Sequence, residues 1–405
     1  MKRTGAAAVL LAALLWNCSG PVELGGTIRD VSSSNTGGAG GGSPSGGPQK
    51  MKSLYVTGVE YPPGYDWRKD LGFSADGAKI FLMKDGVRIV EADVGYDNCI
   101  SADGDMHRCI GGHLYTDFST ETETVVKRDG KEIYRFFGRE MTVGMLIRDD
   151  GVYSLGRPRS GTGWAFRKNG EILMYKGSGD LVSELHEDGG NIYFAYGDSF
   201  GTPSGTENRY YLVENGTPRQ IAATDDVSEI FDVRMKGGTL HYIARMDKLA
   251  QSVLFAGPDG KSYPVSPGSA MRNGKFFFSG SETPFTHGEI LLNGRYEDAF
   301  WHGTDAPQTV VTPEKAVGWC ADGEKIIFAM SLSLAGMGVG IFDGETRHTL
   351  PSEYDFIYSN AIAADSGRYC AGIVSRSEGN SPALWINGEE RRYGFNGAFT
   401  SVSYW

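Results

Sequence analysis

Short apolar runs separated by tight turns recur along the whole chain. Eight of the breaks carry an Asp-Gly or Asn-Gly pair: Asp85-Gly86, Asp129-Gly130, Asn169-Gly170, Asn215-Gly216, Asp259-Gly260, Asn293-Gly294, Asp343-Gly344 and Asn387-Gly388. Gly86 and Gly388 are 302 residues and seven steps apart, so the mean period is 302/7, or about 43 residues. A hairpin-based repeat of this length is typical of a β-propeller blade.

A second set of turns alternates with the first: Asp103-Gly104, Asp150-Gly151, Gly189-Gly190, Gly237-Gly238, Asn273-Gly274, Asp322-Gly323 and Ser366-Gly367. Residues of these types favour the positive φ angles of two-residue hairpin turns. Each period therefore predicts four strands, A to D. Strands A and B flank a turn of the second set, and strands C and D flank an Asx-Gly turn.

The two ends of the chain predict how the ring closes. The first period has strands B, C and D but no strand A, whereas residues 398–405 form a spare strand after the last period. If that strand completes the first blade, it removes a free sheet edge and gives an all-β, eight-bladed propeller. Residues 73–81 also look like an A–B hairpin, and a seven-bladed ring with an irregular first blade is the alternative.

Two segments, residues 73–77 and 321–328, resemble the TolB-type, WD40-like propeller repeat with its S-x-D-G core followed by an I-x-F strand. The resemblance is at the level of the repeat and points to no specific protein. It implies the propeller fold and transfers no activity.

The first fifty residues differ from the rest. Lys2 and Arg3 precede an apolar stretch over residues 5–16, which is typical of a secretory signal peptide. The stretch ends in Leu-Leu-Trp-Asn-Cys and resembles a bacterial lipobox, although Asn17 departs from it, so Cys18 is the expected lipid-modified first residue. Ordinary cleavage nearby is the alternative. We expect a signal peptide over 1–17, a lipidated Gly/Ser-rich linker over 18–50 and a propeller over 51–405.

The net charge of the chain limits the classes of binding partner that we expect. Removal of residues 1–17 takes away two basic residues and no acidic one, which leaves 37 basic and 50 acidic residues, a net charge of −13. Such a chain is a poor candidate for nucleic acid or anionic lipid. We expect an exported, lipid-anchored and monomeric envelope protein facing either the periplasm or the cell surface. Cys99 and Cys109 could form a disulfide across a hairpin or stay as buried thiols.

The long links between blades direct attention to one rim. Turns A–B and C–D are short, whereas links B–C and D–A are long, and positioned loops commonly carry function. Aromatic side chains there could stack on sugars or partner side chains, and arginines could bind carboxylate or sulfate; the alternative is that they pin the loops or form local ion pairs. The candidates are Trp67, Tyr115, Arg157, Arg159, Trp164, Phe200, His287 and Trp301, with Tyr65 and Phe285 beside them.

No catalytic motif, metal-ligand spacing or cofactor motif stands out. Glu184 and His186, two residues apart on one A strand, are the best catalytic candidates because their side chains would point the same way. The leading hypothesis is a non-enzymatic lipoprotein that binds an envelope protein or a glycan on the long-loop rim. A propeller-type glycoside hydrolase or polysaccharide lyase is the enzymatic alternative. A scaffold in outer-membrane assembly is the third, and an apolar patch on an outer strand would favour it.

Overall fold

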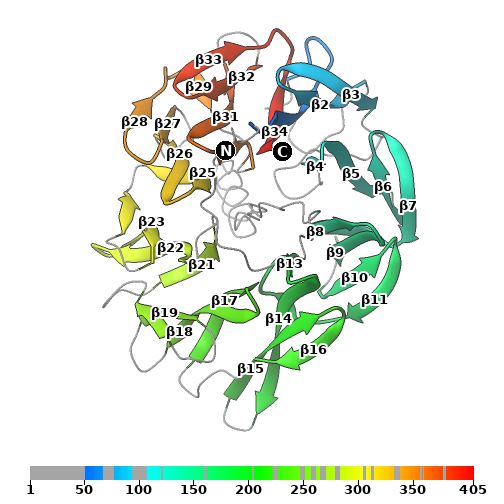
Figure 1. The fold of residues 1–405 in the computed structure, drawn as a ribbon, viewed down its shortest axis with the longest axis vertical. Helices are drawn as coiled ribbons and strands as arrows, with labels where there is room; N and C mark the ends of the chain where they lie inside the picture. Colours follow the sequence, from blue (N-terminus) through cyan, green and yellow to red (C-terminus); the bar gives the residue numbers. More distant parts are fainter. Residues whose placement is uncertain are drawn as a thin grey trace, which may run out of the picture.

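The structure is a computed structural model, and it describes residues 51–66, 77–93, 107–119, 122–158, 162–202, 205–221, 227–246, 251–256, 261–264, 271–278, 283–303, 307–311, 314–332, 338–355, 358, 360–376 and 380–405. Within these ranges the regular elements are all strands. The sheets follow one another around a common axis, with β34, β4, β8, β13, β17, β21 and β25 toward the centre (Figure 1). The chain is thus a β-propeller built from antiparallel, four-stranded blades, as the turn repeat predicts.

The described strands form eight separate sheets. From the axis outward, the first four are β34 (Gly397–Tyr404), β1 (Leu54–Glu60), β2 (Lys79–Lys84), β3 (Val87–Asp93); β4 (His107–Ile110), β5 (His113–Ser119), β6 (Glu123–Arg128), β7 (Lys131–Phe137); β8 (Glu140–Arg148), β9 (Gly151–Pro158), β10 (Trp164–Lys168), β11 (Glu171–Lys176); and β12 (Asp180–Leu181) with β13 (His186–Asp188), β14 (Asn191–Thr202), β15 (Gly205–Glu214), β16 (Thr217–Gln220).

The remaining four sheets continue in chain order. They are β17 (Val227–Lys236), β18 (Thr239–Met246), β19 (Gln251–Ala256), β20 (Lys261–Pro264); β21 (Met271–Phe277), β22 (Phe285–Leu292), β23 (Arg295–His302), β24 (Gln308–Val310); β25 (Lys315–Asp322), β26 (Lys325–Ser331), β27 (Val339–Phe342), β28 (Arg347–Thr349); and β29 (Tyr354–Asp355) with β30 (Ile362–Asp365), β31 (Arg368–Ser375), β32 (Ser381–Ile386), β33 (Glu389–Arg392).

The C-terminal strand completes the first sheet, as predicted. Strand β34 pairs with β1 from Leu54↔Tyr404 to Glu60↔Gly397. Beyond the strands, Ser53 and Trp405 exchange two backbone hydrogen bonds of 2.8 and 3.0 Å. Strand β1 pairs directly with β2 on its other side, so residues 61–78 link two neighbouring strands. Residues 73–76 of the alternative hairpin lie outside the described residues.

A recurring side-chain bond explains why Asp or Asn occupies the C–D turns. The backbone N–H of Asn215 donates to the carbonyl of Ile192, and Asn215 Oδ1 accepts the N–H of the same residue, both at 2.9 Å. Asp85, Asp129, Asn169 and Asn387 make the same pair of bonds to the starts of their B strands. All five have φ near +50° and are followed by a glycine at positive φ. The turn residue therefore supplies both the backbone conformation and a lock between strands B and C.

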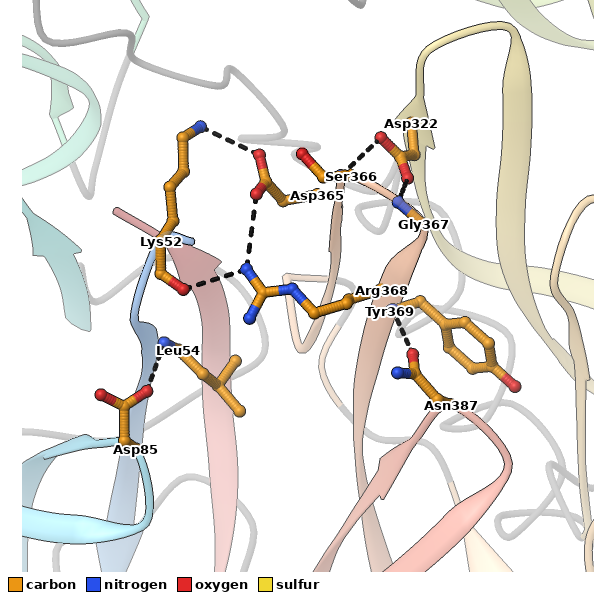
Figure 2. A network of polar contacts seen from close by, with 10 residues as sticks. All are labelled: Lys52, Leu54, Asp85, Asp322, Asp365, Ser366, Gly367, Arg368, Tyr369 and Asn387. Carbon is orange, nitrogen blue, oxygen red and sulfur yellow. Dashed lines mark hydrogen bonds and ion pairs between the residues drawn. The ribbon is translucent and has the colours of Figure 1, made fainter. Parts of the chain in front are cut away.

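The A–B turns are held from the neighbouring blade. Asp188, the last residue of β13, accepts the backbone N–H groups of Gly237 and Gly238 at 2.9 and 2.7 Å. Asp322 at the end of β25 does the same for Ser366, at 2.9 Å, and for Gly367 (Figure 2). These bonds join adjacent blades along the rim that carries the tight turns.

The sheet β21–β24 departs from the predicted layout. Asn293-Gly294 joins its second and third strands, β22 and β23, rather than its third and fourth. Because antiparallel strands alternate in direction, this turn lies on the rim opposite to the other Asx-Gly turns that the structure describes. Asn273-Gly274, predicted as an A–B turn, lies inside β21, where the register with β22 shifts between Arg272 and Lys275. The predicted Asp103-Gly104 turn lies outside the described residues, and Gly111-Gly112 joins β4 to β5.

Candidate functional site

Most of the aromatic residues predicted to line a binding rim belong to the core. Tyr115 in β5, Trp164 in β10 and Trp301 in β23 are buried, and so is Phe285 in β22. Each belongs to a strand: Tyr115 because the turn before β5 is Gly111-Gly112, and Trp301 because Asn293-Gly294 joins β22 to β23. Trp67 and Arg159 lie outside the described residues. The alternative interpretation of these aromatic side chains, as packing residues, is correct for the four buried ones.

Trp164 shows why such residues are buried. It is the first residue of β10, and its indole packs 5.1 Å from the ring of Phe194 and 4.9 Å from that of Tyr196, both on the next blade. An aromatic residue at this level fills the widening gap between two blades. The side chain is thus required for packing and is withdrawn from solvent.

His287 is likewise a core residue rather than a loop ligand. It lies in β22, stacks on Phe300 with 4.7 Å between ring centroids and has its Nε2 3.2 Å from Asp298 Oδ1. The other carboxylate oxygen of Asp298 accepts the N–H of Ala316 on the next blade. His287 therefore belongs to a buried inter-blade contact.

Three other candidates keep some exposure. Phe200, near the end of β14, is 39% exposed and lies under the guanidinium of Arg209. Arg157 in β9 donates to the carbonyl of Leu181 at 3.2 Å, and burial lowers its pKa. Tyr65 stacks on Tyr61 and packs against the core. The described residues therefore do not assemble these side chains into one aromatic site.

The catalytic candidates are adjacent, but His186 is already engaged. Its Nε2 accepts the backbone N–H of Met235 at 2.9 Å, so the ring proton is on Nδ1, which faces the carbonyl oxygen of Glu184 at 3.1 Å. Burial, with the nearby charge of Arg234, lowers the pKa of His186 to about 3. A neutral imidazole with both nitrogens bonded to backbone groups holds two blades together and is not available as a general base.

Glu184 instead belongs to a group of charged residues on the innermost strands, here called the inner charged cluster: Arg108, Glu184, Arg234 and Lys275. Arg108 is in β4, Arg234 in β17 and Lys275 in β21, and Glu184 lies between β12 and β13. Burial raises the pKa of Glu184, and the charges of Arg234, Lys275 and Arg108 oppose this rise. All four side chains keep partial exposure.

A second feature was not predicted at any residue. The outermost strands of three consecutive blades expose seven large apolar side chains: Val87 and Ile89 in β3, Ile133 and Phe137 in β7, and Ile172, Leu173 and Tyr175 in β11. We call this surface the apolar outer edge. Phe137 is 83% exposed and Val87 65%. The edge strands β16, Thr-Pro-Arg-Gln, and β33, Glu-Glu-Arg-Arg, are polar.

The three strands are neighbours in space. A Cβ at Gly130, in the C–D turn of the second blade, would meet Ala92 of β3, and one at Gly170 would meet Tyr134 of β7. Each turn therefore packs against the outermost strand of the preceding blade. In β7 and β11 most positions face solvent, and several of these positions hold apolar residues. Apolar residues in a D strand are thus the sequence signal for this surface.

The cysteines and possible metal ligands add little to the site. Cys109 is a free, buried thiol in β4, and burial raises its pKa to about 11. The free thiol is the alternative considered for Cys109, and its proposed partner Cys99 lies outside the described residues. Lipidation of Cys18 stays a prediction. Within the described ranges, no three His, Cys, Asp or Glu side chains gather as metal ligands would. The same ranges contain no helix with the length and apolarity to span a bilayer.

Comparisons with known proteins define the fold alone. No family model and no curated protein sequence matches the chain. Among solved structures, a dihydro-heme d1 dehydrogenase, NirN, determined in complex with DHE, superposes with a TM-score of 0.51 at 10% identity, covering 86% of this chain and 74% of that one. Apo AztD from Citrobacter koseri gives a TM-score of 0.49 at 9% identity, covering 87% of this chain and 98% of that one.

Proposed function

We propose that this chain is a lipid-anchored binding protein of the bacterial cell envelope whose propeller docks a protein partner on the apolar outer edge. The observation that carries the proposal is the grouping of seven exposed apolar side chains on β3, β7 and β11. Single exposed apolar residues are ordinary, whereas contiguous groups mark interaction surfaces. The long-loop rim is the weaker candidate because its aromatic residues are mostly buried.

The charges around the apolar outer edge favour a protein over a bilayer. Acidic and basic side chains are mixed on these strands: Glu91 pairs with Lys79 and Arg88, and Glu132 pairs with Arg135. The surface therefore lacks the excess of basic residues that attracts anionic lipid. Arg135 binds Glu132 and Glu123 at the border of the surface. An apolar centre with a charged border is the usual composition of a protein interface.

The enzymatic alternative has less support. A glycoside hydrolase requires a pair of titratable groups at the reaction centre. Of the two candidates, His186 is bonded through both ring nitrogens. Glu184 remains, and burial raises its pKa, but no second titratable group is placed beside it as the partner that this chemistry needs among the described residues other than the buried Asp232, whose oxygens accept backbone N–H groups.

Site-specific photocrosslinking tests the docking surface. A photoreactive amino acid is placed at Phe137 or Tyr175 of the full chain in its native host, and adducts are identified by mass spectrometry. We expect a discrete protein adduct from both positions. Arg219 in β16 is the matched control, since it is exposed on the outermost strand of another blade. Equal labelling from 137, 175 and 219, or lipid adducts alone, would contradict the proposal.

The anchor is tested separately with Cys18→Ser. The thiol is the acceptor of the lipid, so the variant should leave the membrane fraction and lose incorporation of radiolabelled palmitate. Retention of label by the variant would contradict lipidation at this residue.

The scaffold hypothesis is the second candidate, and the same apolar outer edge favours it. A scaffold in outer-membrane assembly would yield membrane-assembly proteins as the crosslinked partner from 137 and 175. A soluble envelope protein as partner would favour a simple binding protein instead.

We also infer that the eight sheets are eight blades of one ring closed by β34. The pairing of β34 with β1 and the link from Lys52 to Asp365 and Arg368 (Figure 2) support this closure. An experimental map with seven blades, or with β34 unpaired, would contradict it.

A further inference from the structure

The three strands of the apolar outer edge share an irregularity in their pairing. In β3, β7 and β11 the register with the third strand of the sheet shifts at the third residue after the turn glycine. The extra residue is Ile89, Ile133 or Leu173, and all three side chains are exposed. The other outermost strands, as far as the structure describes them, pair without such a shift. A bulge with an exposed apolar side chain is therefore repeated in three consecutive blades.

These bulges affect how a partner can attach. A regular edge strand offers a continuous row of N–H and C=O groups to which a further strand can pair, and a bulge interrupts that row. Around the bulge of β11, the consecutive residues Ile172 and Leu173 are both exposed. The edge backbone thus disfavours the addition of strands, whereas the apolar side chains are presented to solvent. We therefore expect attachment through side chains.

The surface is also preformed. A Cβ at Gly130 would lie 3.0 Å from the Cβ of Ala92 in β3, and one at Gly170 would lie 3.1 Å from the ring of Tyr134 in β7. Each C–D turn is thus packed tightly on the outermost strand of the blade before it, and the three strands follow one another along one side of the ring (Figure 1). No rearrangement is needed before a partner docks.

The charge of these strands distinguishes a copy of this chain from other partners. Together β3, β7 and β11 have a net charge of zero, because they hold four basic and four acidic residues: Arg88, Lys131, Arg135, Lys176, Glu91, Asp93, Glu132 and Glu171. The mature chain as a whole carries −13. Two acidic molecules can associate only where the surfaces in contact are locally neutral, whereas a foreign partner attracted by charge requires a charged surface.

The exposed apolar area is adequate for a dimer. The seven side chains expose on the order of 600 Å² in each copy, since each such side chain can bury roughly 100–200 Å². Two copies together would bury about 1,200 Å², which is the lower limit for a specific and stable interface. A twofold dimer uses the same patch on both copies, so one neutral, apolar surface is complementary to itself.

We propose that the apolar outer edge is a twofold interface through which two copies of this chain form a dimer. The inference rests on the proposed docking function and names its partner as a second copy, in place of the monomer expected from the sequence. The bulges limit the assembly to two copies, because they disfavour continued pairing of strands along the edge.

Photocrosslinking with two tags distinguishes a second copy from another protein. Two versions of the full chain are co-expressed in the native host, with different epitope tags inserted in the Gly/Ser-rich segment 37–48. A photoreactive amino acid replaces Phe137 or Tyr175. We expect from both positions an adduct of twice the chain mass that contains both tags, and none from Arg219 on β16.

The outcomes separate the dimer from the docking function. Adducts from positions 137 and 175 that contain only another protein would overturn the dimer and leave the docking proposal standing. Lipid adducts alone, or no adduct from either position, would overturn both.

Sedimentation equilibrium of the full chain with Cys18→Ser measures the association without detergent, which would compete for the apolar surface. We expect a dimer at a chain concentration of about 10 μM. Phe137→Ala should raise the dissociation constant about 10-fold or more, because a symmetric interface loses the ring twice. Phe200→Ala removes an exposed phenylalanine on another blade and should leave the constant unchanged. A wild-type monomer at about 100 μM, or equal effects of the two substitutions, would overturn the dimer.

Lys131→Glu tests the requirement for a neutral surface. Lys131 is exposed at the start of β7, and its replacement gives the three strands a net charge of −2 in each copy. The dissociation constant of the dimer should rise about 10-fold at low salt and recover in about 0.5 M NaCl. Arg219→Glu on β16 changes the total charge equally and should have no effect. Equal effects of these two substitutions, or tighter association of Lys131→Glu, would overturn the proposal.

Discussion

A single Asp or Asn residue stabilises each of these turns in two ways, through its backbone conformation and through a side-chain hydrogen bond. Asp85, Asp129, Asn169, Asn215 and Asn387 adopt φ near +50° and also bond to strand B through the side chain. Glycine would satisfy the backbone and alanine would satisfy neither requirement. The recurring Asx is therefore a consequence of the blade geometry.

Asn215 and Asn293 separate the two contributions. Both have φ of 49°, but only Asn215 has a side-chain bond to strand B among the described residues. Asn215→Gly should lower the free energy of unfolding by about 1 kcal/mol, because the N–H of Ile192 loses its partner. Asn293→Gly should change it by less than about 0.5 kcal/mol. Urea denaturation measures both, and equal losses would contradict the role of the bond.

His186 should make stability depend on pH. Its pKa of about 3 in the folded protein lies below the ordinary value near 6.5, so the unfolded chain binds the proton first. The contribution of the neutral ring is complete above pH 6.5 and is lost as the pH falls toward 3. His186→Phe should cost about 1–3 kcal/mol at pH 7, where it orphans the N–H of Met235. The difference from wild type should narrow at pH 5, and parallel stabilities would contradict this.

At the scale of elements, the sequence predicted which segments form strands and turns more accurately than it predicted where each lies within its blade. The pattern predicts all eight Asx-Gly turns on one rim, but Asn293-Gly294 lies on the opposite rim, and Asp259-Gly260 lies outside the described residues. The spacing does carry a signal: Gly260 to Gly294 is 34 residues and Gly294 to Gly344 is 50, which together make two periods of 42. In this sheet the turn lies between the second and third strands instead of the third and fourth. His287 and Trp301, predicted in loops, therefore lie in buried parts of β22 and β23.

Strand β34 is expected to be indispensable although it is the last of the chain. Phe399 is 2% exposed and packs against Phe81, Phe395 and Tyr393. Phe399→Ala should cost about 3–5 kcal/mol in the free energy of unfolding. Phe137→Ala, on a side chain that is 83% exposed, should cost less than about 0.5 kcal/mol. Similar losses for the two would show that β34 is not part of the core.

At the scale of the molecule, the propeller and its C-terminal strand could be predicted because a repeat of turns determines them locally. The candidate site could not. Arg108, Glu184, Arg234 and Lys275 are far apart in sequence and meet only through the ring, and no linear motif marks them. The apolar outer edge was missed for a related reason: whether an apolar strand residue faces a neighbouring blade or solvent depends on which strand is outermost.

A circular permutant tests closure of the whole molecule. A short glycine linker from Trp405 to Ser53 and new ends between Gly294 and Arg295 leave every strand pair in place. The permutant should fold with wild-type circular dichroism and a Tm within a few degrees of the wild type. A chain ending at residue 396 should not, because β1 loses its partner over seven paired positions. Failure of the permutant with success of the truncation would contradict closure.

The bonds between Ser53 and Trp405 also determine how the molecule bears mechanical load. In a chain held at its N-terminus, any pull from that side reaches the propeller at residues 52 and 53. The first contacts to be strained are the two backbone bonds to Trp405 and the bonds of Lys52 to Asp365 and Arg368. The force is thereby shared between the first sheet and the last one. Tension at the N-terminus then loads the contacts between these two sheets instead of separating one strand from its neighbour.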